Sequence, residues 1–560
     1  MSHYKCLCIS DFNIDNLAGY LNNQVQPSVS TTVAPYGQVI QTLMNEQAEY
    51  WQEKFNLALV WTQPHNVIKA FQHALNYENI SLEKVLDEVD TFASVLLNAA
   101  GRVDFMLVPS WVIPSYNRGY GMLDLKPGIG LNHMLMHMNL RLAERLSQAN
   151  NVFMLNTQRW IEVAGRQAFN PKLWYMAKVP FGNPVFKEAV NDIKAALAGI
   201  SGQTKKLVIV DLDDTLWGGI VGDLGWENIS LGGHDLAGEA FVDFQTALKS
   251  LTNRGLVLGI VSKNSEEVAL TAIKNHPEMV LKIDDFAGWR INWQDKAQNV
   301  ADLVTELNLG LQSVVFIDDN PVERARVREA LPEVFVPEWP ADKSLYTKTL
   351  MELTCFDTAS ISHEDKSRAE MYVTERKRND LRQQMGSLDD WLKTLEISVK
   401  VEPLNPTNLP RTAQLLNKTN QMNLSTRRMT ETELQAWLES GDRQLWTFRV
   451  ADRFGDSGLT GIISLDVVDG AGQIIDFILS CRVMGRKVEE TMLATAVNYA
   501  QSIGLKHVYA QYIPTAKNKP CLEFWQRSGF EQNGQNDTFM WNAANCYCVP
   551  EHVTIQTEEA

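Results

Sequence analysis

The chain has 560 residues, of which 45% are hydrophobic. This length is too great for one core, so we expect two to four domains. A net charge of -16 and a pI near 5.2 leave no basic surface for nucleic acid or for an anionic membrane. The apolar runs are shorter than the roughly 18 residues that a membrane span needs, and no signal-peptide core follows the first residues, so we expect a soluble, cytoplasmic protein.

The first predicted domain covers residues 1–203. Short apolar runs at 56–61, 103–108 and 151–155 alternate with helical patterns, which is typical of an α/β layer fold. A polar stretch, 201–206, marks the boundary to the next domain.

The second predicted domain covers residues 204–360. Its predicted strands at 207–210, 256–261 and 313–317 are continuous apolar runs separated by helical patterns. Such runs indicate parallel strands covered on both faces, so we expect a doubly wound sheet.

Polar side chains follow each of these strands. Asp211 and Asp213 lie two positions apart after the first strand, so in extended geometry both carboxylates project to the same side. Open α/β sheets place ligands at the carboxyl ends of their strands. Asp211 is our candidate nucleophile and magnesium ligand, and Asp213 our candidate acid/base and a further metal ligand.

The next strand ends in Ser262-Lys263-Asn264, which offers a hydroxyl, a cation and an amide to a phosphoryl group. Ser262 is the candidate phosphate donor. Lys296, at the start of a helical pattern, would neutralise the nucleophile and the phosphoryl oxygens.

The third strand ends in Asp318-Asp319-Asn320, followed by a proline at a plausible first helical position. Asp318 and Asp319 would complete the magnesium shell. Each piece alone is ordinary, because acidic pairs commonly cap helices and Asp-Asn-Pro is common turn chemistry. All four motifs in this order are much harder to obtain by chance, so together they strongly indicate one phosphoryl-transfer site.

After a charged, helix-favouring linker at 361–390, a third domain is predicted at 391–545, and residues 546–560 are predicted to be a tail. The apolar run 473–479 is followed by a polar loop at 480–487 and a helical pattern from Val488. The architecture is therefore three α/β or α+β domains in series.

The four motifs of the second domain resemble those of the haloacid dehalogenase superfamily. That resemblance implies that Asp211 forms an aspartyl phosphate, Asp213 is the acid/base, Ser262 and Lys296 hold the phosphate, and Asp318 and Asp319 serve Mg²⁺. The runs 214–222, 261–264, 286–293 and 316–325 more closely resemble the FkbH-like family, subfamily IIIC, and the likeness extends to 417–428. Substrate contacts are then expected from Trp217, Gly218, Gly219, Lys263, Asn264 and Asn320.

The third domain resembles the GNAT acyltransferases in its order of strand, loop and helix. In those proteins the N–H groups at the helix start receive a pyrophosphate. Here Lys487 stands where a small residue is usual, so a phosphopantetheine arm, which lacks the adenosine end of coenzyme A, is the expected ligand. Arg482 and Arg486 would pair with its phosphate, and Asn518 belongs to a later GNAT motif.

Cys481 is the candidate carrier of a glyceryl thioester, because Arg482 and the helix start would lower the pKa of its thiol. A small buried apolar residue is the alternative interpretation, and Cys521 and Cys355 are rival thiols. The seven cysteines form no Cys-x-x-Cys pairs and indicate reduced thiols.

The first domain resembles the SGNH hydrolases, but Phe12 stands where their nucleophilic serine would be, and no Asp-x-x-His motif follows. We therefore expect it to be non-catalytic, as a docking or dimer surface. His133 and His137 share a helix face, and we interpret them as packing residues.

The FkbH-like resemblance implies a glyceryl transferase-phosphatase. Such an enzyme takes a glyceryl unit from 1,3-bisphosphoglycerate, removes the remaining phosphate with Mg²⁺, and loads an acyl carrier protein for polyketide or related biosynthesis. The alternatives are a magnesium-dependent phosphatase of a soluble metabolite and a non-catalytic scaffold that binds carrier proteins.

Overall fold

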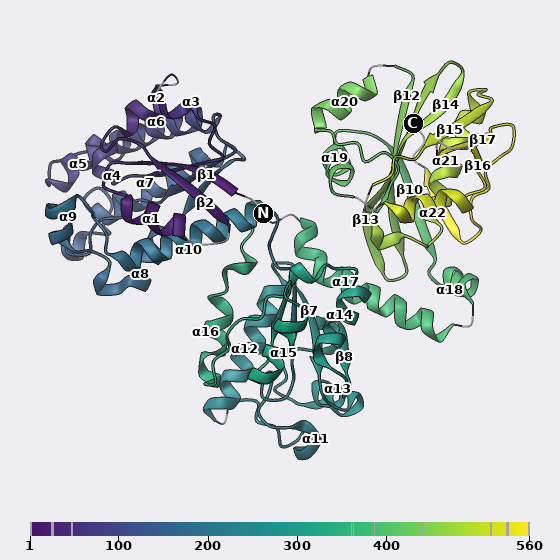
Figure 1. Cartoon of the computed structure of the whole chain (residues 1–560), viewed down its shortest axis with the longest axis horizontal. Helices are drawn as coiled ribbons and strands as arrows, with labels where there is room; N and C mark the ends of the chain where they lie inside the picture. The colour runs from purple at the N-terminus through teal and green to yellow at the C-terminus, as the bar shows by residue number, and fades with distance from the viewer. Residues whose placement is uncertain are drawn as a thin grey trace. The chain divides into compact units, whose positions relative to one another are not determined.

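The computed structural model describes residues 3–23, 27–45, 47, 49–233, 235–359, 361, 363–385, 387–419, 421–439, 441–515, 518–533 and 537–557. Three sheets follow one another along the chain (Figure 1). We call the parts built on them the first, second and third regions.

The first region is built on a parallel sheet of five strands in the order β2-β1-β3-β4-β5. The strands are β1 His3–Ser10, β2 Ser28–Val33, β3 Leu57–Trp61, β4 Phe105–Pro109 and β5 Val152–Leu155. The helices are α1 Asp15–Asn23, α2 Val39–Met44, α3 Glu49–Gln52, α4 Pro64–Val67, α5 Lys69–Leu75, α6 Leu82–Ala100, α7 Leu131–Leu146, α8 Thr157–Ala164, α9 Pro171–Ala177 and α10 Asn183–Ile200.

Alternation along β1 divides the core of this region into two layers. Leu7 and Ile9 pack in the cluster that contains residues of α6 and α7, whereas Cys6 and Cys8 pack in the one that contains residues of α1 and α10. Successive side chains of a strand point to opposite faces, so helices cover both sides of the sheet. The predicted α/β layer fold and its three quoted strands are confirmed, and the SGNH likeness stays a prediction.

The second region contains a four-stranded sheet in the order β8-β7-β6-β9. The strands are β6 Leu207–Val210, β7 Val257–Ser262, β8 Phe286–Ile291 and β9 Val314–Ile317. Every residue of β6, β7 and β9 is buried, as the continuous apolar runs predicted. The chain builds outward from β6 to β8 and then returns to place β9 on the other side of β6. The topological switch point therefore lies between β6 and β9.

Helices connect these strands. They are α11 Val221–Leu224, α12 Leu236–Thr252, α13 Glu266–Asn275, α14 Lys296–Glu306, α15 Pro321–Ala330 and α16 Tyr346–Met351. As predicted, Lys296 begins α14 and Pro321 begins α15. Proline suits that position because its fixed φ is already helical and its missing N–H would have had no partner.

The third region has a mixed sheet in the order β16-β17-β15-β14-β13-β12-β10-β18. Its strands are β10 Ile397–Pro403, β11 Met422–Asn423, β12 Arg443–Asp452, β13 Gly455–Val468, β14 Ala471–Leu479, β15 His507–Gln511, β16 Glu531–Asn533, β17 Thr538–Asn542 and β18 Val553–Thr557. Its helices are α17 His363–Gln384, α18 Leu388–Thr394, α19 Leu409–Lys418, α20 Glu431–Glu439, α21 Val488–Ser502 and α22 Lys519–Arg527.

Two short strands depart from the sequence-based expectations. Residues 553–557 form β18, which pairs in parallel with β10, so the prediction of a tail at 546–560 is wrong for these residues. Val553 is buried there, and this apolar contact fixes the segment. The other strand is β11, which pairs with the end of β14.

Strand β11 lies where β14 and β15 separate. These two strands pair in parallel only at residues 472–474 and 508–510. Beyond that point Leu424 donates its N–H to Phe477 and accepts a hydrogen bond from the N–H of Ile513. Residues 422–424 therefore fill the gap between the two strands with hydrogen-bonded backbone.

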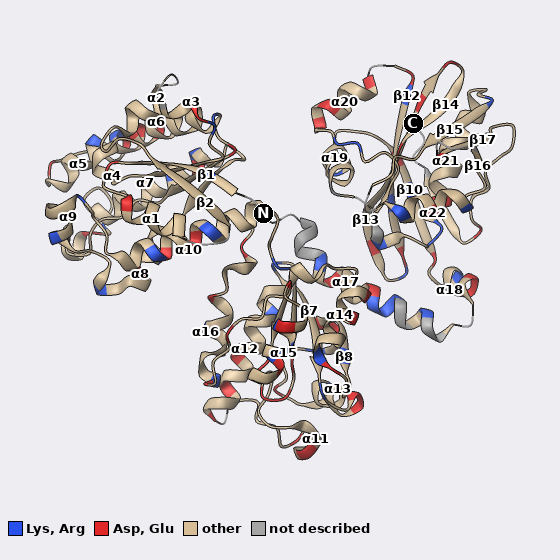
Figure 2. Cartoon of the chain, in the orientation of Figure 1, with Lys and Arg blue, Asp and Glu red and all other residues tan. Residues whose placement is uncertain are grey.

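Acidic and basic residues are interspersed along all three regions in Figure 2. Among the residues that the structure describes, no helix is long and apolar enough to cross a membrane.

Candidate functional site

Three carboxylates meet at the switch point of the second sheet. Asp211 follows β6, and Asp318 and Asp319 follow β9, because the carboxyl ends of neighbouring parallel strands open at one edge. One oxygen of each residue lies within 4.8 Å of the others. Asp211 is 6% exposed and Asp318 is fully buried. Three oxygen ligands at this spacing suit Mg²⁺, a hard cation.

Only one oxygen of the Asp211 carboxylate has a partner among the residues described. Its Oδ2 lies 3.0 Å from Nζ of Lys296, which is itself 3% exposed. Its Oδ1 is buried and has no hydrogen-bond partner among the residues described. A buried anionic oxygen without a donor is costly, and a bound cation removes that cost. The donor set therefore fits a magnesium ion.

Asp213 is not one of these three carboxylates, and its metal role stays a prediction; three donors fix its side chain. Its Oδ1 accepts from the indole N–H of Trp217 at 2.9 Å and from the backbone N–H of Val221 at 3.1 Å, and its Oδ2 accepts from Asn264 at 2.9 Å. Burial raises the pKa of the Asp213 carboxyl above its usual range, against the opposing effect of the Val221 and Trp217 hydrogen bonds. A raised pKa suits a group that must both give and take a proton.

The turn after β6 makes this geometry possible. Asp214 has a positive φ of 55°, and its carboxylate accepts from the N–H of Gly219. Gly219 has φ of 92°, and a Cβ at that position would lie 2.5 Å from Leu224. Trp217 is fully buried, so its indole positions Asp213, whereas the substrate contacts predicted for 217–219 remain a prediction.

The other predicted residues of the second region lie at the ends of elements. Ser262 ends β7 and is 2% exposed, while Lys263 beside it is exposed. Asn320 is exposed and caps α15 by accepting from the N–H of Val322. The carboxylate of Asp318 in turn accepts from the N–H of Asn320.

One residue of this site was missed by the sequence analysis. Arg324 is 7% exposed, and its guanidinium donates to the backbone carbonyls of Asp318 at 2.8 Å and Asp319 at 2.7 Å. It thereby fixes the loop that carries two of the three carboxylates. Its place in the first turn of α15, one turn after an acidic pair, was the available signal.

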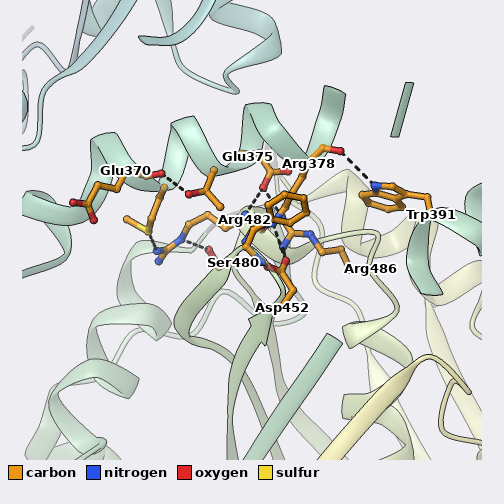
Figure 3. Close-up of polar contacts among 11 residues, drawn as sticks. Glu370, Glu375, Arg378, Trp391, Asp452, Ser480, Arg482 and Arg486 are labelled. Atoms are coloured by element: carbon orange, nitrogen blue, oxygen red, sulfur yellow. Dashed lines mark hydrogen bonds and ion pairs between the residues drawn. The ribbon is translucent and has the colours of Figure 1, made fainter. Parts of the chain in front are cut away.

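In the third region, the predicted anion-binding arginines already have partners (Figure 3). Arg486 is 2% exposed and forms ion pairs with Glu375 of α17 at 2.5 Å and with Asp452 at 3.2 Å. Arg378 of α17 binds the same Asp452 at 2.7 Å. Arg482 donates to Ser480 and to the sulfur of Met371. A phosphate at Arg486 would have to displace Glu375.

Asn518 is fully buried, and its side chain is fully used by neighbouring groups. Its amide donates to the carbonyls of Asn423 and Ile513, and its oxygen accepts from Tyr512 and from the N–H of Thr515. These bonds hold β11 beside the chain that follows β15. In this arrangement Asn518 supports the sheet, and ligand binding by it stays a prediction.

Three cysteines were considered as reactive thiols, and the structure gives evidence on two of them. Cys481 lies in a short 3-10 turn, residues 481–483, and its side chain is outside the described part of the chain. Burial raises the pKa of Cys521 to about 12 and that of Cys355 to about 12. Such thiols are poor nucleophiles at neutral pH.

In the first region, the residues that were considered for catalysis or metal binding form ring contacts with other side chains. Phe12 is 1% exposed and packs edge-on against Trp61 and Phe181. The rings of His133 and His137 lie 4.6 Å apart on α7. No carboxylate or cysteine joins them in a metal-type cluster within the described residues.

Comparison with known proteins gives one informative likeness. No protein-family model matches the chain, and no curated protein sequence matches it. A solved structure from Bacteroides fragilis, the N-terminal part of the protein BF1531 containing a phosphatase domain complexed with Mg, is 29% identical with a TM-score of 0.57. The match covers 64% of this chain and 95% of that one.

Acetyltransferases also match about a quarter of the chain. A GNAT-family acetyltransferase from Staphylococcus aureus is 11% identical, with a TM-score of 0.22, over 26% of this chain and 99% of that one. The ribosomal-protein-S18-alanine N-acetyltransferase from Escherichia coli is 12% identical, with a TM-score of 0.20, over 25% and 90%. These likenesses are too weak to assign an activity to the third region.

Proposed function

We propose that the second region is a magnesium-dependent phosphatase in which Asp211 is the nucleophile. The observation that carries this proposal is the buried, unpartnered Oδ1 of Asp211, beside Lys296 and within one cluster with Asp318 and Asp319. A carboxylate oxygen at a sheet edge that no described donor occupies is suited to attack phosphorus.

Each residue then has a defined task. Asp211 attacks the phosphorus of a phosphate ester, and the ester oxygen leaves with a proton from Asp213. Water next attacks the aspartyl phosphate while Asp213 takes back a proton, which releases phosphate and restores both carboxyls. Lys296, 3.0 Å from the Asp211 carboxylate, would neutralise the phosphoryl oxygens after the attack. Asp211, Asp318 and Asp319 would hold Mg²⁺, which supplies positive charge to the phosphoryl group.

The similar structure from Bacteroides fragilis supports this reading, since it contains a phosphatase domain and is complexed with Mg. At 29% identity it does not identify the substrate.

For the substrate, we propose the glyceryl unit that the FkbH-like resemblance implies. In 1,3-bisphosphoglycerate, the thiol of a carrier-bound phosphopantetheine would displace phosphate from the acyl phosphate and form a thioester. The remaining phosphate ester would be hydrolysed at Asp211, leaving a glyceryl thioester and a second phosphate. A phosphatase of a soluble phosphorylated metabolite is the simpler alternative. It would need only the second reaction, hydrolysis of a phosphate ester at Asp211.

The test is intact-mass analysis of a pantetheinylated acyl carrier protein incubated with the full chain, 1,3-bisphosphoglycerate and Mg²⁺. We expect a glyceryl adduct with the native chain and a phosphoglyceryl adduct, or none, with Asp211→Asn. Asp302→Asn, the same exchange at an exposed position of α14, should behave as native. Phosphate release with an unmodified carrier would exclude glyceryl transfer, and full phosphatase activity of Asp211→Asn would exclude the nucleophile.

A further inference from the structure

A pocket in the third region lies apart from the loop where an anion was expected. It is lined by Arg427, Arg428, Met429, Glu433, Ala436 and Trp437. These residues come from the segment after β11 and from α20.

Arg427 is fixed in place by a buried carboxylate. Its Nε and Nη2 donate to the two oxygens of Asp476, which is fully buried and also accepts from Ser464. Its remaining nitrogen, Nη1, has no hydrogen-bond partner among the residues described, and it is not among the buried unpartnered atoms. Nη1 is therefore a solvent-accessible donor on a guanidinium that cannot swing away.

The ring of Trp437 contacts two guanidinium groups, of which only that of Arg427 belongs to a residue lining the pocket. The guanidinium of Arg427 lies 4.3 Å from the ring centroid, and that of Arg443 lies 4.9 Å from it. Arg443 is held by Asp466 at 3.0 Å and by the carbonyl of Trp437. Stacked guanidinium groups are weakly hydrated and already ordered, which lowers the cost of receiving a phosphate.

Arg428 and Glu433 also line the pocket, and other groups hold both side chains in place. Arg428 donates to the carbonyls of Leu416 and Thr419 at the end of α19. Glu433 accepts from the N–H and hydroxyl of Thr430, which lowers the pKa of its carboxyl and keeps it ionised. Glu433 is the carboxylate that lines the pocket itself, and Asp476 lies behind Arg427. An anion would bind at the outward guanidinium nitrogens, while an N–H or O–H of the same ligand could bind Glu433.

The backbone of this segment is ordered by the sheet itself. Residues 422–424 are hydrogen bonded to β14 on one side and to Ile513 and Asn518 on the other. Arg427 and Arg428 follow after only two further residues, and the bonds of their own side chains to Asp476, Leu416 and Thr419 set their positions before any ligand arrives. Preorganised donors of this kind bind anions without an ordering cost.

We propose that this pocket binds the phosphate group of an organic phosphate ester whose remaining chain carries amide or hydroxyl donors. The proposal rests on the third region alone and does not require the phosphatase chemistry of Asp211. Such an ester can arrive as a free small molecule or as the phosphopantetheine of a carrier protein, and both present the same chemistry.

The experiment is calorimetric titration of the full chain with 4′-phosphopantetheine, in the Asp211→Asn background so that the ester is not turned over. Ala436 is exposed on α20, so Ala436→Glu adds a charge at the rim without disturbing buried groups, and Ala436→Gln is its neutral control. We expect Ala436→Glu to weaken binding at least tenfold and Ala436→Gln to leave it within twofold. Glu433→Gln, which preserves the helix cap, should tighten it.

Pantetheine without its phosphate should bind at least tenfold more weakly than the phosphorylated form. Equal affinities of the two compounds, or equal affinities of Ala436→Glu and Ala436→Gln, would overturn the proposal. Titration with a pantetheinylated and an unmodified carrier protein then separates the sources. Binding that needs the prosthetic arm and is lost in Ala436→Glu assigns the pocket to the carrier, and binding of the free ester alone assigns it to a small molecule.

Discussion

Lys296 and Asp211 form a buried ion pair in the second region. Both side chains are almost fully enclosed and lie 3.0 Å apart. Removing one partner of such a pair leaves an uncompensated buried charge, which costs about 3–5 kcal/mol.

We therefore predict that Lys296→Gln lowers the rate of phosphate release at least about 100-fold, because the phosphoryl oxygens lose the cation that would neutralise their charge. Single-turnover phosphate release measures this rate. Lys274→Gln, at an exposed site on α13, is the control and should retain native rates. Native rates in Lys296→Gln would remove that residue from the mechanism.

Trp217→Phe should change the pH dependence of the reaction. The indole N–H favours the ionised form of Asp213, so its loss raises the pKa of that carboxyl further. The limb of the kcat profile that reports ionisation of Asp213 should then move to higher pH. Trp289→Phe, which removes an N–H bonded to Glu266, should leave the profile in place. An unshifted limb in Trp217→Phe would show that Asp213 does not control it.

For the site of the second region, the sequence indicated which residues lie close together but not the hydrogen bonds that each side chain forms. Asp211, Lys296, Asp318 and Asp319 were predictable because strand ends and helix starts could be read from apolar runs. The contacts of Trp217 and Asn264 with Asp213 depend on the turn at 211–221, whose positive φ at Asp214 has no clear sequence signature. The substrate contacts expected of these two residues came from the FkbH-like resemblance and stay a prediction.

Among the elements, α15 begins directly after the loop that carries Asp318 and Asp319. Asn320 caps the helix, and losing an N-cap side chain costs about 1 kcal/mol. We predict that Asn320→Ser keeps the stability of the native chain, whereas Asn320→Ala loses about 1 kcal/mol in urea unfolding.

The same pair of variants tests the predicted substrate contact of Asn320. If the residue only caps α15, Asn320→Ser should also keep native kcat/KM. A lower kcat/KM at native stability would instead place the amide on the substrate.

The strands that sequence reasoning missed are those with little local signal. β11 has only two residues, and β18, with the sequence VTIQT, lacks the continuous apolar run by which the other strands were recognised. Both exist because partners far along the chain complete their hydrogen bonds. The continuous apolar strands of the first and second regions, in contrast, were recognisable from their own composition.

For the whole molecule, pH acts on stability through buried carboxyls. Burial raises the pKa of Glu489 in the third region from its usual value near 4.5 to about 7. The folded state thus holds a proton that the unfolded chain releases at lower pH. Stability is fully present below about pH 4.5 and falls as the pH rises to about 7.

We predict that Glu489→Gln removes this fall, which is on the order of 3 kcal/mol for a shift of this size. Urea unfolding of the third-region transition at pH 5 and pH 8 measures it. Glu523→Gln, on the exposed face of α22, should keep the native pH dependence. An unchanged dependence in Glu489→Gln would show that another group is responsible.

The division into three α/β or α+β regions followed from apolar periodicity and polar boundaries, and the structure contains the three sheets in that order. The function of the flanking regions did not follow in the same way. Their candidate residues, such as Arg486 and Asn518, carry the expected chemistry but are occupied by partners that only the fold brings near.

Strand β11 also constrains the order in which the third region can assemble. It precedes β12 to β15 in the chain, yet its hydrogen-bond partners lie in β14 and after β15. These contacts of high sequence separation require closure of long loops, so they form late in folding. Arg427 and Arg428 reach their final positions only when the sheet is complete, and a nascent or partly folded chain presents no assembled pocket.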